Sequence, residues 1–257
     1  MKRHKICKII FAILAVFLCV AFYELIGICI TYKKQPAVSD ATIKETQNIM
    51  SVAGRENTER AVIIEKNSQA LLERVRLIQN AKDEIILSTF AFKSDESGKL
   101  ILGALHDAAD RGVHVRILVD GMESWIDMEG NPYFYGLSSH ENVEIKLYNK
   151  ANPLKPWKTM GRMHDKYLIA DGKIYILGGR NTYNYFLGDF PGHKNFDRDV
   201  LVVCDEPQKD NSVNQLWNYF ETIWEQEDCR YFHNSKKLAD RQSVKKAVLE
   251  LQEGYQQ

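Results

Sequence analysis

The clearest chemical signal in this sequence is a histidine and a lysine that are two residues apart. His164 and Lys166 open a segment whose run of Tyr, Leu and Ile predicts a β-strand. Side chains two positions apart on a strand project from the same face of a sheet. An imidazole can attack phosphorus and a lysine can neutralise a phosphoryl oxygen, so the pair predicts a phosphate site with nucleophilic chemistry.

The same segment predicts a β-hairpin, which determines what lies opposite the pair. Asp171-Gly172 separates two runs rich in Ile, Leu and Tyr, a pattern typical of a two-residue turn with positive φ at both residues. Directly opposed residues share a face of the sheet. Gly179, opposite His164, has no side chain and would leave room for a tetrahedral anion. The predicted pairs are Ala170 with Lys173, Leu168 with Tyr175, Lys166 with Leu177, and His164 with Gly179, which places His164, Lys166, Gly179 and Asn181 on one side.

The spacing of these residues resembles the motif of the phospholipase D superfamily. That motif consists of His-x-Lys, four residues, Asp, six residues and then Gly-[Gly/Ser]-x-Asn. The resemblance implies a phospholipase D-like α/β lobe and phosphodiester transfer through a covalent phosphohistidine, with neither a cofactor nor a metal ion. Every position of the motif is present, at His164, Lys166, Asp171, Gly178, Gly179 and Asn181.

The resemblance also implies a role for most of these positions. His164 would attack phosphorus, while Lys166 and Asn181 would neutralise the equatorial oxygens as negative charge develops on them. The glycines that would border the phosphate are Gly178 and Gly179.

Two aspartates complete the set of candidate catalytic residues. Asp171 belongs to the motif, yet turn chemistry alone explains an Asp at this position, so a structural interpretation stays open. In cardiolipin synthase-like members an acidic residue at the start of the next strand holds the catalytic histidine, and Asp199 matches that position by its context. A carboxylate on one ring nitrogen would fix the tautomer that leaves the other nitrogen nucleophilic. The competing candidates are Asp197 and, with weaker support, Asp189 and His193.

The sequence contains one copy of the motif. None of the other six histidines is followed by Lys two positions later. Members of the superfamily use a second His-Lys pair to protonate the leaving alcohol, so the chain resembles the N-terminal lobe of a two-motif enzyme. The second pair would come from a homodimer partner, from a two-motif relative, or from a C-terminal half that this sequence lacks.

The first 32 residues predict a membrane anchor. Residues 1–8 form a basic flank, and residues 9–32 are apolar apart from Glu24. At ~1.5 Å rise per residue, this run covers a hydrocarbon core of ~30 Å. No small-residue cleavage site closes the run, which favours an uncleaved anchor over a signal peptide. The positive-inside rule predicts a single-pass protein of the cell membrane, with a cytoplasmic N-terminus and the remaining domain outside.

The pattern of elements after the anchor predicts one α/β lobe. Residues 33–59 are interpreted as a polar linker, residues 60–233 as the lobe, and residues 234–257 as a polar, exposed helical tail. Strand and helix patterns alternate from 61 to 119, which favours a mixed, largely parallel sheet flanked by helices. The irregular, aromatic stretch 122–157 is interpreted as a lip over the site, a loop packed on the domain, or an edge that contacts lipid headgroups. Strands are predicted at 61–64, 84–92, 113–119, 143–148 and 200–203, and helices at 70–81, 100–108 and 213–224.

The composition counts against some classes of function and leaves others open. Thirty-four basic and 34 acidic residues balance to a net charge of zero, which argues against a nucleic-acid partner. Cys204 and Cys229 indicate no metal cluster and leave one disulfide open. The favoured function is a membrane-bound phospholipase D or cardiolipin synthase-like phosphodiesterase or phosphatidyltransferase that acts on phospholipid. The alternatives are a catalytically incomplete lobe that binds phospholipid or a partner, and a phospholipase D-type nuclease.

Overall fold

The chain is organised as two compact units in the computed structural model. The structure describes residues 2–33, 39–44, 59–150, 152, 154–206, 211–233 and 235–256. One unit combines Met1–Asn57 with Ala151–Gly161, and the other combines Thr58–Lys150 with Arg162–Gln257. Most of the predicted linker, residues 33–59, lies outside the described residues. The larger unit contains the whole of the predicted hairpin.

The larger unit is built on one mixed β-sheet. Among the described residues the sheet has eight strands, in the order β1-β7-β6-β5-β2-β3-β4-β8. The central strands β2 and β3 are buried along nearly their whole length, as expected for apolar runs that are covered on both faces. The strands are β1 (Glu59–Ile64), β2 (Glu84–Thr89), β3 (His114–Asp120), β4 (Val143–Tyr148), β5 (Tyr167–Ala170), β6 (Ile174–Gly178), β7 (Asp199–Cys204) and β8 (Cys229–Tyr231).

The predicted mixed α/β class with flanking helices is confirmed, but the expectation of a largely parallel sheet is wrong. Within the described sheet, parallel pairing joins only β2 to β3 and β3 to β4. The other five pairs are antiparallel. The alternating pattern from 61 to 119 suggested a crossover connection, and hence a parallel pair, between successive strands. Strand β1 instead pairs with the distant β7, and the hairpin strand β5 takes the position beside β2.

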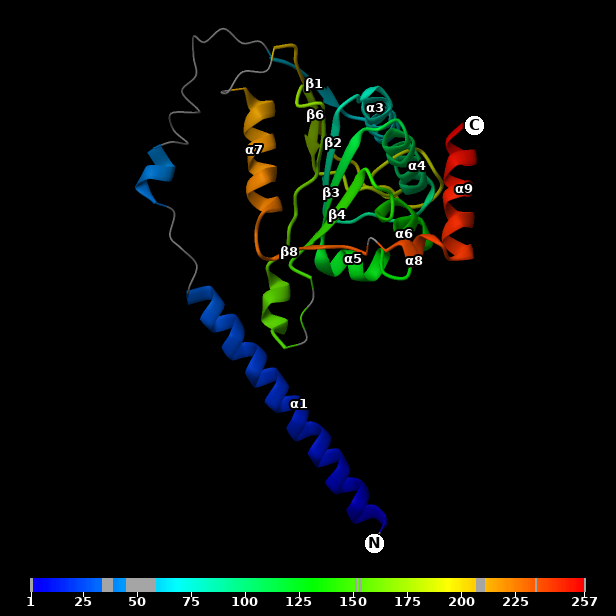
Figure 1. The fold of residues 1–257 in the computed structure, drawn as a ribbon. Helices are drawn as coiled ribbons and strands as arrows, with labels where there is room; N and C mark the ends of the chain where they lie inside the picture. The colour runs from blue at the N-terminus through cyan, green and yellow to red at the C-terminus, as the bar shows by residue number, and fades with distance from the viewer. Residues whose placement is uncertain are drawn as a thin grey trace. The chain divides into compact units, whose positions relative to one another are not determined.

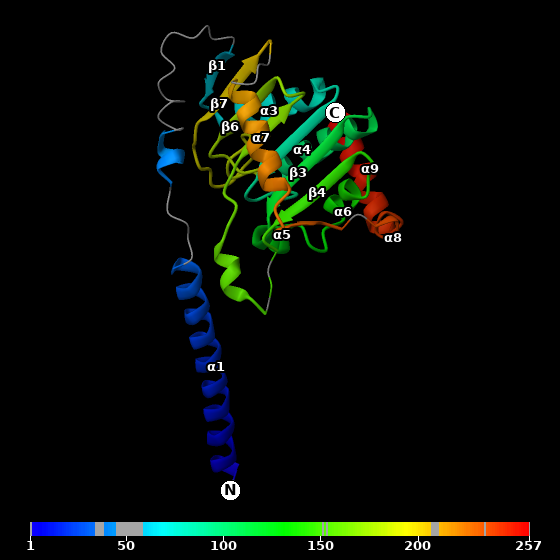
Figure 2. The same ribbon diagram turned by 60° about the vertical axis from the view of Figure 1, so that its left-hand side comes forward.

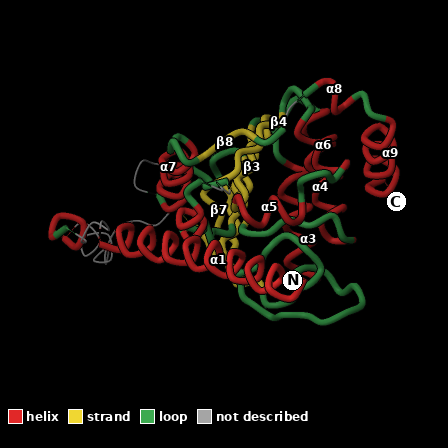
Figure 3. The backbone as a smooth tube through the Cα atoms, turned by 90° about the horizontal axis from the view of Figure 1, so that it is seen from below, coloured by secondary structure: helices red, strands yellow, loops and turns green. Residues whose placement is uncertain are grey.

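Helices cover both faces of the sheet and give the larger unit three layers (Figure 1). Helix α7 lies on one face, and α3, α4, α6 and α9 lie on the other. The view along the sheet in Figure 3 shows the strands between these two groups of helices, and Figure 2 shows α7 along the near face. The helices named here are α3 (Asn67–Asn80), α4 (Glu96–Asp110), α6 (Pro132–Ser138), α7 (Ser212–Trp224) and α9 (Gln242–Gln256).

Two apolar cores hold these layers together. Leu168 belongs to the core between the sheet and helices α3 and α4, whereas Tyr167 and Ile169 belong to the core beneath α7. Alternate residues of β5 therefore face opposite layers, as the two-residue period of a strand requires. By the same alternation Lys166 belongs to the α3 and α4 side, and Asp165 to the α7 side.

The predicted hairpin forms, but its register differs by one residue from the prediction. Asp171 and Gly172 both have positive φ, and the Lys173 N–H donates to the Ala170 carbonyl at 3.1 Å, as the two-residue turn requires. Lys173 nevertheless stays outside the ladder as an extra residue. The observed pairs are Tyr167 with Leu177, Leu168 with Ile176, Ile169 with Tyr175 and Ala170 with Ile174.

Contacts with the neighbouring strands explain the extra residue. The Lys173 carbonyl accepts a hydrogen bond from the Cys204 N–H of β7 at 2.8 Å. On the other side of the turn, the Asp171 N–H donates to the carbonyl of Glu84 in β2 at 2.9 Å. The turn is therefore fixed by bonds to two other strands, which the hairpin sequence does not encode.

The shift changes which residues lie opposite the catalytic candidates. The Gly178 N–H donates to the Lys166 carbonyl at 3.2 Å, so Gly178 lies opposite Lys166 where Leu177 was predicted. A shift of one residue exchanges the two faces of a strand. The predicted pairing of Gly179 with His164 is therefore wrong in this register, and Gly179 itself follows the end of β6.

Two regions that were expected to be irregular or exposed are helical and packed. The stretch 122–157 contains most of α5 (Gly121–Asp127), all of α6, and the start of the 3-10 helix η1 (Pro156–Met160). The C-terminal segment forms α8 (Lys236–Ala239) and α9. Helix α9 packs on α4 and α6 with Val244, Ala247 and Leu251 buried, because its apolar residues recur at helical spacing.

The smaller unit contains a long apolar helix. Helix α1 spans Lys2–Lys33, and its residues His4–Ile30 are long and apolar enough to cross a membrane. The predicted span of 9–32 falls within α1. The same unit contains η1, which belongs to the connection between β4 and β5.

Candidate active site

The predicted catalytic residues gather at one edge of the sheet because of the directions of its strands. Strands β2 and β3 are parallel, so both of their carboxyl ends reach this edge. Strand β5 is antiparallel to β2, so it begins at the same edge, and the alternation continues through β6 and β7. The edge therefore receives Lys166 before β5, Gly178 at the end of β6 and Asp199 at the start of β7. Ligand sites commonly lie at the carboxyl ends of parallel strands.

His164 is exposed at this edge and packs against an aromatic ring. Its imidazole meets the Phe90 ring edge-on, with the ring centroids 4.6 Å apart. The Lys166 ammonium lies 5.3 Å from the centroid of the same ring, and the Arg162 guanidinium lies 4.8 Å from it. An aromatic face attracts nearby cations. Phe90, which directly follows β2, thus packs against both the imidazole and the ammonium group of the motif.

Lys166 is a buried cation with unused hydrogen-bonding capacity. The residue is 5% exposed, and its Nζ donates to the His164 carbonyl at 2.7 Å. An ammonium group has three donors, and among the described residues this carbonyl is its one hydrogen-bond acceptor. Burial lowers the pKa of Lys166, and the negative charges of Asp165 and Asp197 oppose that shift. A buried ammonium with free donors is suited to bind an anion such as phosphate.

Asp165, which separates His164 from Lys166, points to the opposite layer. Its Oδ2 accepts a hydrogen bond from the Tyr219 hydroxyl of α7 at 2.8 Å. Burial, together with this carboxylate, raises the pKa of Tyr219 to about 12. The alternation of side chains between the two faces therefore begins before β5. It places Asp165 on the opposite face from His164 and Lys166.

Asn181 is hydrogen-bonded to the segment that follows β2 and contains Phe90. Its side chain is buried, and its Oδ1 accepts a hydrogen bond from the Ala91 N–H at 3.2 Å. Phe92 and Thr182 form an isolated parallel bridge directly beyond this contact. Because the amide oxygen is held by the backbone, the amide NH2 group is available as a donor. The structure thus places His164 and Lys166 against Phe90, and Asn181 against the next residue of the same segment.

The two glycines of the motif leave room for carboxylates. A Cβ atom at Gly178 would lie 1.9 Å from Asp199 Oδ1, and one at Gly179 would lie 2.0 Å from Asp197 Oδ2. Both distances are far inside van der Waals contact, so a side chain at either position would displace an aspartate. Close packing against the two aspartates is what these glycines permit in the structure, and their role in binding phosphate stays a prediction.

Asp199 is a buried counter-ion of two arginines. The residue is 1% exposed, its Oδ2 accepts a hydrogen bond from Arg74 Nη1 at 2.8 Å, and the same oxygen lies 3.2 Å from Arg180 Nη1. Its Oδ1 has no hydrogen-bond partner among the described residues. The sequence predicted that this carboxylate holds the His164 ring, but the described structure shows no hydrogen bond between them. Two buried guanidinium groups require a counter-charge, which gives Asp199 a structural role.

Asp197 is, after Asp165, the second aspartate whose charge acts on the motif lysine. Its negative charge is one of the causes that set the pKa of Lys166, and its carboxylate lies against Gly179. Its Oδ1 also accepts a hydrogen bond from the Arg198 N–H at 2.7 Å. Both aspartates lie against a motif glycine, and of the two it is Asp197, the competing candidate, whose charge acts on Lys166.

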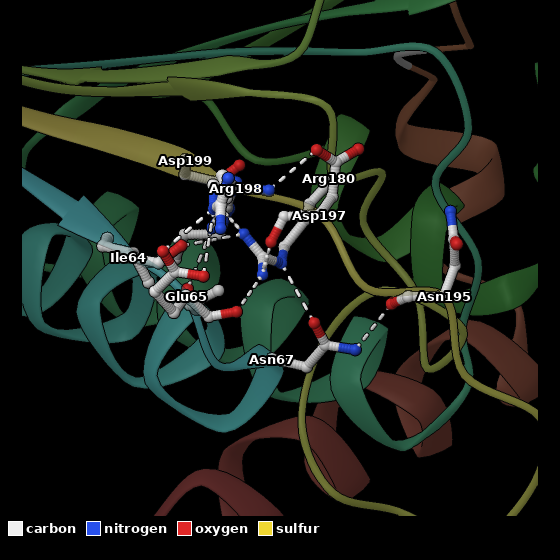
Figure 4. Close-up of polar contacts among 10 residues, drawn as sticks. Ile64, Glu65, Asn67, Arg180, Asn195, Asp197, Arg198 and Asp199 are labelled. Carbon is white, nitrogen blue, oxygen red and sulfur yellow. Dashed lines mark hydrogen bonds and ion pairs between the residues drawn. The ribbon is translucent and has the colours of Figure 1, made fainter.

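Arg180 occupies the position that the motif leaves unspecified, and it ties this acidic segment in place (Figure 4). Its side chain is buried, and its Nε donates to Asn67 Oδ1 at 3.1 Å. Its Nη2 donates to the carbonyls of Glu65, at 2.6 Å, and Asp197. One planar guanidinium with several donors thus joins the end of β1, the start of α3 and the segment that enters β7.

Asp120 holds the segment that precedes His164. This buried residue ends β3, and its Oδ1 accepts from Arg162 Nε at 2.9 Å while its Oδ2 accepts from the Met163 N–H at 3.1 Å. Oδ1 also caps α5 by accepting from the N–H groups of Met122 and Glu123. Asp120 therefore couples the end of a central strand to the backbone that carries the imidazole.

Asp171 lies at the other end of β5 from His164. Its carboxylate accepts hydrogen bonds from the backbone N–H groups of residues 82–84, at 2.8 to 3.1 Å. The seven residues from His164 to Asp171 extend on the order of 20 Å at ~3.3 Å per residue. The structure therefore separates Asp171 from the other candidates and favours its structural interpretation.

Sequence analysis missed the residues that support the motif. Phe90 and Asp120 stand at the carboxyl ends of the two parallel strands, and this position was the one available signal for them. Arg74 and Arg180 looked like ordinary helix and loop residues, because their burial depends on the fold. The residues missed in this way are Arg74, Phe90, Asp120, Arg162 and Arg180.

Cysteines and acidic residues form neither a disulfide nor a metal site in the described part of the chain. All five cysteines are free thiols, so the disulfide left open for Cys204 and Cys229 is not formed. No group of three His, Cys, Asp or Glu side chains suited to a metal ion is present among the described residues. The absence of a metal requirement stays a prediction.

The sequence is similar to bacterial proteins of one family. The family described as cardiolipin synthase, PLD-like domain, matches residues 75–224, which is more than half of the chain. An uncharacterised protein of Helicobacter pylori (strain ATCC 700392 / 26695) is 33% identical over 181 residues, covering 65% of this chain and 35% of that protein. Cardiolipin synthase C of Escherichia coli (strain K12) is 29% identical over 154 residues, covering 54% of this chain and 31% of that protein. The chain thus spans about a third of the length of these relatives.

The fold is also similar to a solved structure. Nuc from Salmonella typhimurium, described as a phospholipase D family member, superposes with a TM-score of 0.51 at 17% identity. The superposition covers 68% of this chain and 99% of that chain, so the shared fold is a single lobe. The sequence match from 75 to 224 contains the entire hairpin motif and the strands that gather its residues at one edge. The chain therefore belongs to the cardiolipin synthase, PLD-like domain family of the phospholipase D superfamily.

Proposed function

We propose that this chain forms one half of a phospholipase D-type active site, which acts on phospholipid phosphodiesters through a phosphohistidine at His164. The observation that carries the proposal is the exposed imidazole of His164 beside the buried, incompletely hydrogen-bonded ammonium of Lys166. The family supports phosphodiesterase or phosphatidyltransferase activity, and a cardiolipin synthase among the relatives supports phospholipid as the substrate class.

The reaction would proceed in two displacements at phosphorus. In the first, a ring nitrogen of His164 forms a bond to phosphorus while the bond to the leaving alcohol oxygen breaks. The Lys166 ammonium would neutralise the charge that grows on the equatorial oxygens, and the amide NH2 group of Asn181 would donate hydrogen bonds to them. In the second, water or an acceptor alcohol breaks the nitrogen–phosphorus bond and restores the imidazole. Water gives hydrolysis, and an alcohol gives phosphatidyl transfer.

A complete site needs a second His-Lys pair. The leaving oxygen must receive a proton in the first step, and the incoming hydroxyl must lose one in the second. We assign both transfers to a second pair, supplied by another copy of this chain, by a two-motif relative, or by the remainder of a longer protein. The exposure of His164 at the sheet edge and the one-third coverage of the relatives support this assignment.

Helix α1 would place this half-site at its substrate. A helix with the apolar span His4–Ile30 supports a single-pass anchor in the cell membrane. The basic residues before the span favour a cytoplasmic N-terminus, with the lobe on the other side.

The test is turnover of phospholipid by the full chain in liposomes, with an acceptor alcohol present and the mass of the solubilised protein measured alongside. The expected result is product formation by an assembly of two or more copies, with an acid-labile phosphoprotein intermediate. Cleavage of short DNA without lipid turnover would favour a nuclease. Lipid binding without any turnover would favour the incomplete lobe.

A further inference from the structure

A loop that precedes the catalytic motif packs on the apolar helix α1. The Trp157 loop, residues 154–161, belongs to the same compact unit as α1. The Trp157 ring meets the Tyr23 ring edge-on, with centroids 4.9 Å apart, and the Tyr23 hydroxyl donates to the Leu154 carbonyl at 3.0 Å. A Cβ atom at Gly27 would lie 2.4 Å from Trp157 Cδ2. Tyr23 and Gly27, one helical turn apart, therefore form the surface on which the indole packs.

The contact lies beside Glu24, in the second half of the apolar span His4–Ile30, and the cost of a charge at mid-bilayer favours a place for Glu24 near one boundary of the hydrocarbon core. Residues 9–23 carry no charge, and Glu24 is the one acidic residue of the helix. Lysine side chains before this run can extend toward the headgroups, so a core of ~30 Å fits between about Lys5 and Glu24 at ~1.5 Å per residue. Trp and Tyr are enriched at the boundary between hydrocarbon and water. The Tyr23–Trp157 pair falls at that level.

The Trp157 loop also exposes large apolar side chains beside a lysine. Leu154 is 79% exposed and Met160 is 72% exposed, and Lys155 is exposed between them. Backbone hydrogen bonds from the Lys158 N–H to the Lys155 carbonyl and from the Gly161 N–H to the Lys158 carbonyl, both 3.0 Å, keep the loop compact. Exposed apolar residues with interspersed lysine are typical of segments that bind the surface of an anionic bilayer.

We propose that the Trp157 loop is seated in the membrane–water interface, with Leu154 and Met160 inserted among the lipid headgroups. The partner is the bilayer that α1 crosses, because the loop is packed on α1 at the level of its boundary. The inference rests on the proposed function and deepens it. The loop continues directly into Arg162, Met163 and His164, so it would supply the site with phospholipid from the same bilayer.

The depth of Trp157 tests the seating directly. The full chain is placed in vesicles that contain anionic lipid and a lipid with a quenching nitroxide near the headgroup, and tryptophan emission is recorded. The quenching seen with the unaltered chain should be lost in Trp157→Phe and retained in Trp125→Phe, which removes the exposed tryptophan of α5. Equal quenching in Trp157→Phe and the unaltered chain would overturn the proposal.

A comparison of two substrates separates this proposal from the proposed function. In the double variant Leu154→Ser, Met160→Ser, turnover of vesicle phospholipid should fall about tenfold, because two apolar side chains leave the interface. Turnover of a small, soluble chromogenic phosphodiester should not change, and Leu249→Ser, on exposed surface of α9, should change neither rate. Unchanged vesicle turnover, or equal loss on both substrates, would overturn the seating. Inactivity of the unaltered chain on both substrates would count against the proposed function alone, since quenching still decides the seating.

Discussion

The two ends of strand β5 belong to one motif but differ in how completely their polar groups are satisfied. At one end, the Asp171 carboxylate accepts hydrogen bonds from the backbone of residues 82–84. At the other end, the buried Lys166 ammonium donates to one carbonyl, and the His164 ring is exposed. Buried polar groups are normally paired, so incomplete pairing marks the end that is built for a ligand. Asp171 thus helps to build the fold, whereas His164 and Lys166 form the part of the motif that we propose performs the chemistry.

The largest effect is expected from removing the imidazole at the ligand end. His164→Ala should reduce turnover by at least about 10³-fold, because the nucleophile that forms the covalent intermediate is lost. Stability should change little, since the side chain is exposed. The measurements are phospholipid turnover, trapping of phosphoprotein in acid-free gels, and urea unfolding. A phosphoprotein that persists in this variant would refute the assignment of the nucleophile.

Asp199 lies at the ligand edge of the sheet, yet its carboxylate is bound to two arginines of the protein. Asp199→Asn leaves Arg74 and Arg180 without their buried counter-charge, and it should lower the free energy of unfolding by about 3–5 kcal/mol. Turnover per folded molecule should change far less. Urea titration measures the free energy of unfolding, and turnover rates normalised to folded protein measure the effect on catalysis. Unchanged stability with a rate lower by orders of magnitude would restore the role at the His164 ring that the sequence predicted.

Asp197 should behave in the opposite way. Asp197→Asn removes a negative charge that acts on Lys166, and it should slow turnover about 10²-fold if the carboxylate also orients the imidazole. The free energy of unfolding should change little, because no buried cation depends on this side chain for its hydrogen bonds in the described structure. Turnover and urea unfolding of Asp197→Asn and Asp199→Asn, measured side by side, form the test. An unaltered rate would remove Asp197 from the site.

At the Asp171 end of β5, the variant Asp171→Ala should lower stability and leave turnover unchanged. The backbone N–H groups of residues 82–84 lose their acceptor, which should lower the free energy of unfolding by about 1–3 kcal/mol. The matched control is Asp189→Ala, an exposed aspartate whose loss should cost less than about 0.5 kcal/mol. Turnover per folded molecule should match that of the unaltered chain. A strong rate loss without destabilisation would assign Asp171 to catalysis.

The smallest effect is expected from titration of Lys166. Burial lowers its pKa in the folded chain below the ~10.4 of an unfolded lysine, so the folded state releases the proton first. Stability should therefore rise slightly with pH between the folded pKa and ~10.4, because the unfolded chain binds more protons there. Turnover should fall as pH rises through the folded pKa, since the neutral amine cannot neutralise phosphate. Lys166→Arg should remove this alkaline limb from the kcat/KM profile, and a limb that persists would assign it to another group.

Features with local causes could be predicted from the amino-acid sequence alone. The motif spacing, the positive φ values at Asp171 and Gly172, and the strand at 143–148 all follow from residues that are close along the chain. The side chain of Asp165 points away from those of His164 and Lys166, and this too could be predicted, because successive side chains of a strand point to opposite faces. The turn interpretation of Asp171 could be stated in advance for the same reason.

Three features depended on contacts between distant segments of the fold: the register of the hairpin, the directions of the neighbouring strands and the partners of the buried charges. Lys173 leaves the ladder because Cys204, 31 positions later, takes its carbonyl, and Asp199 turns to arginines because Arg74 arrives from a different element. These choices depend on hydrogen bonds and ion pairs between segments that are distant along the chain. A local pattern shows that such groups need partners, and the fold selects which partners they receive.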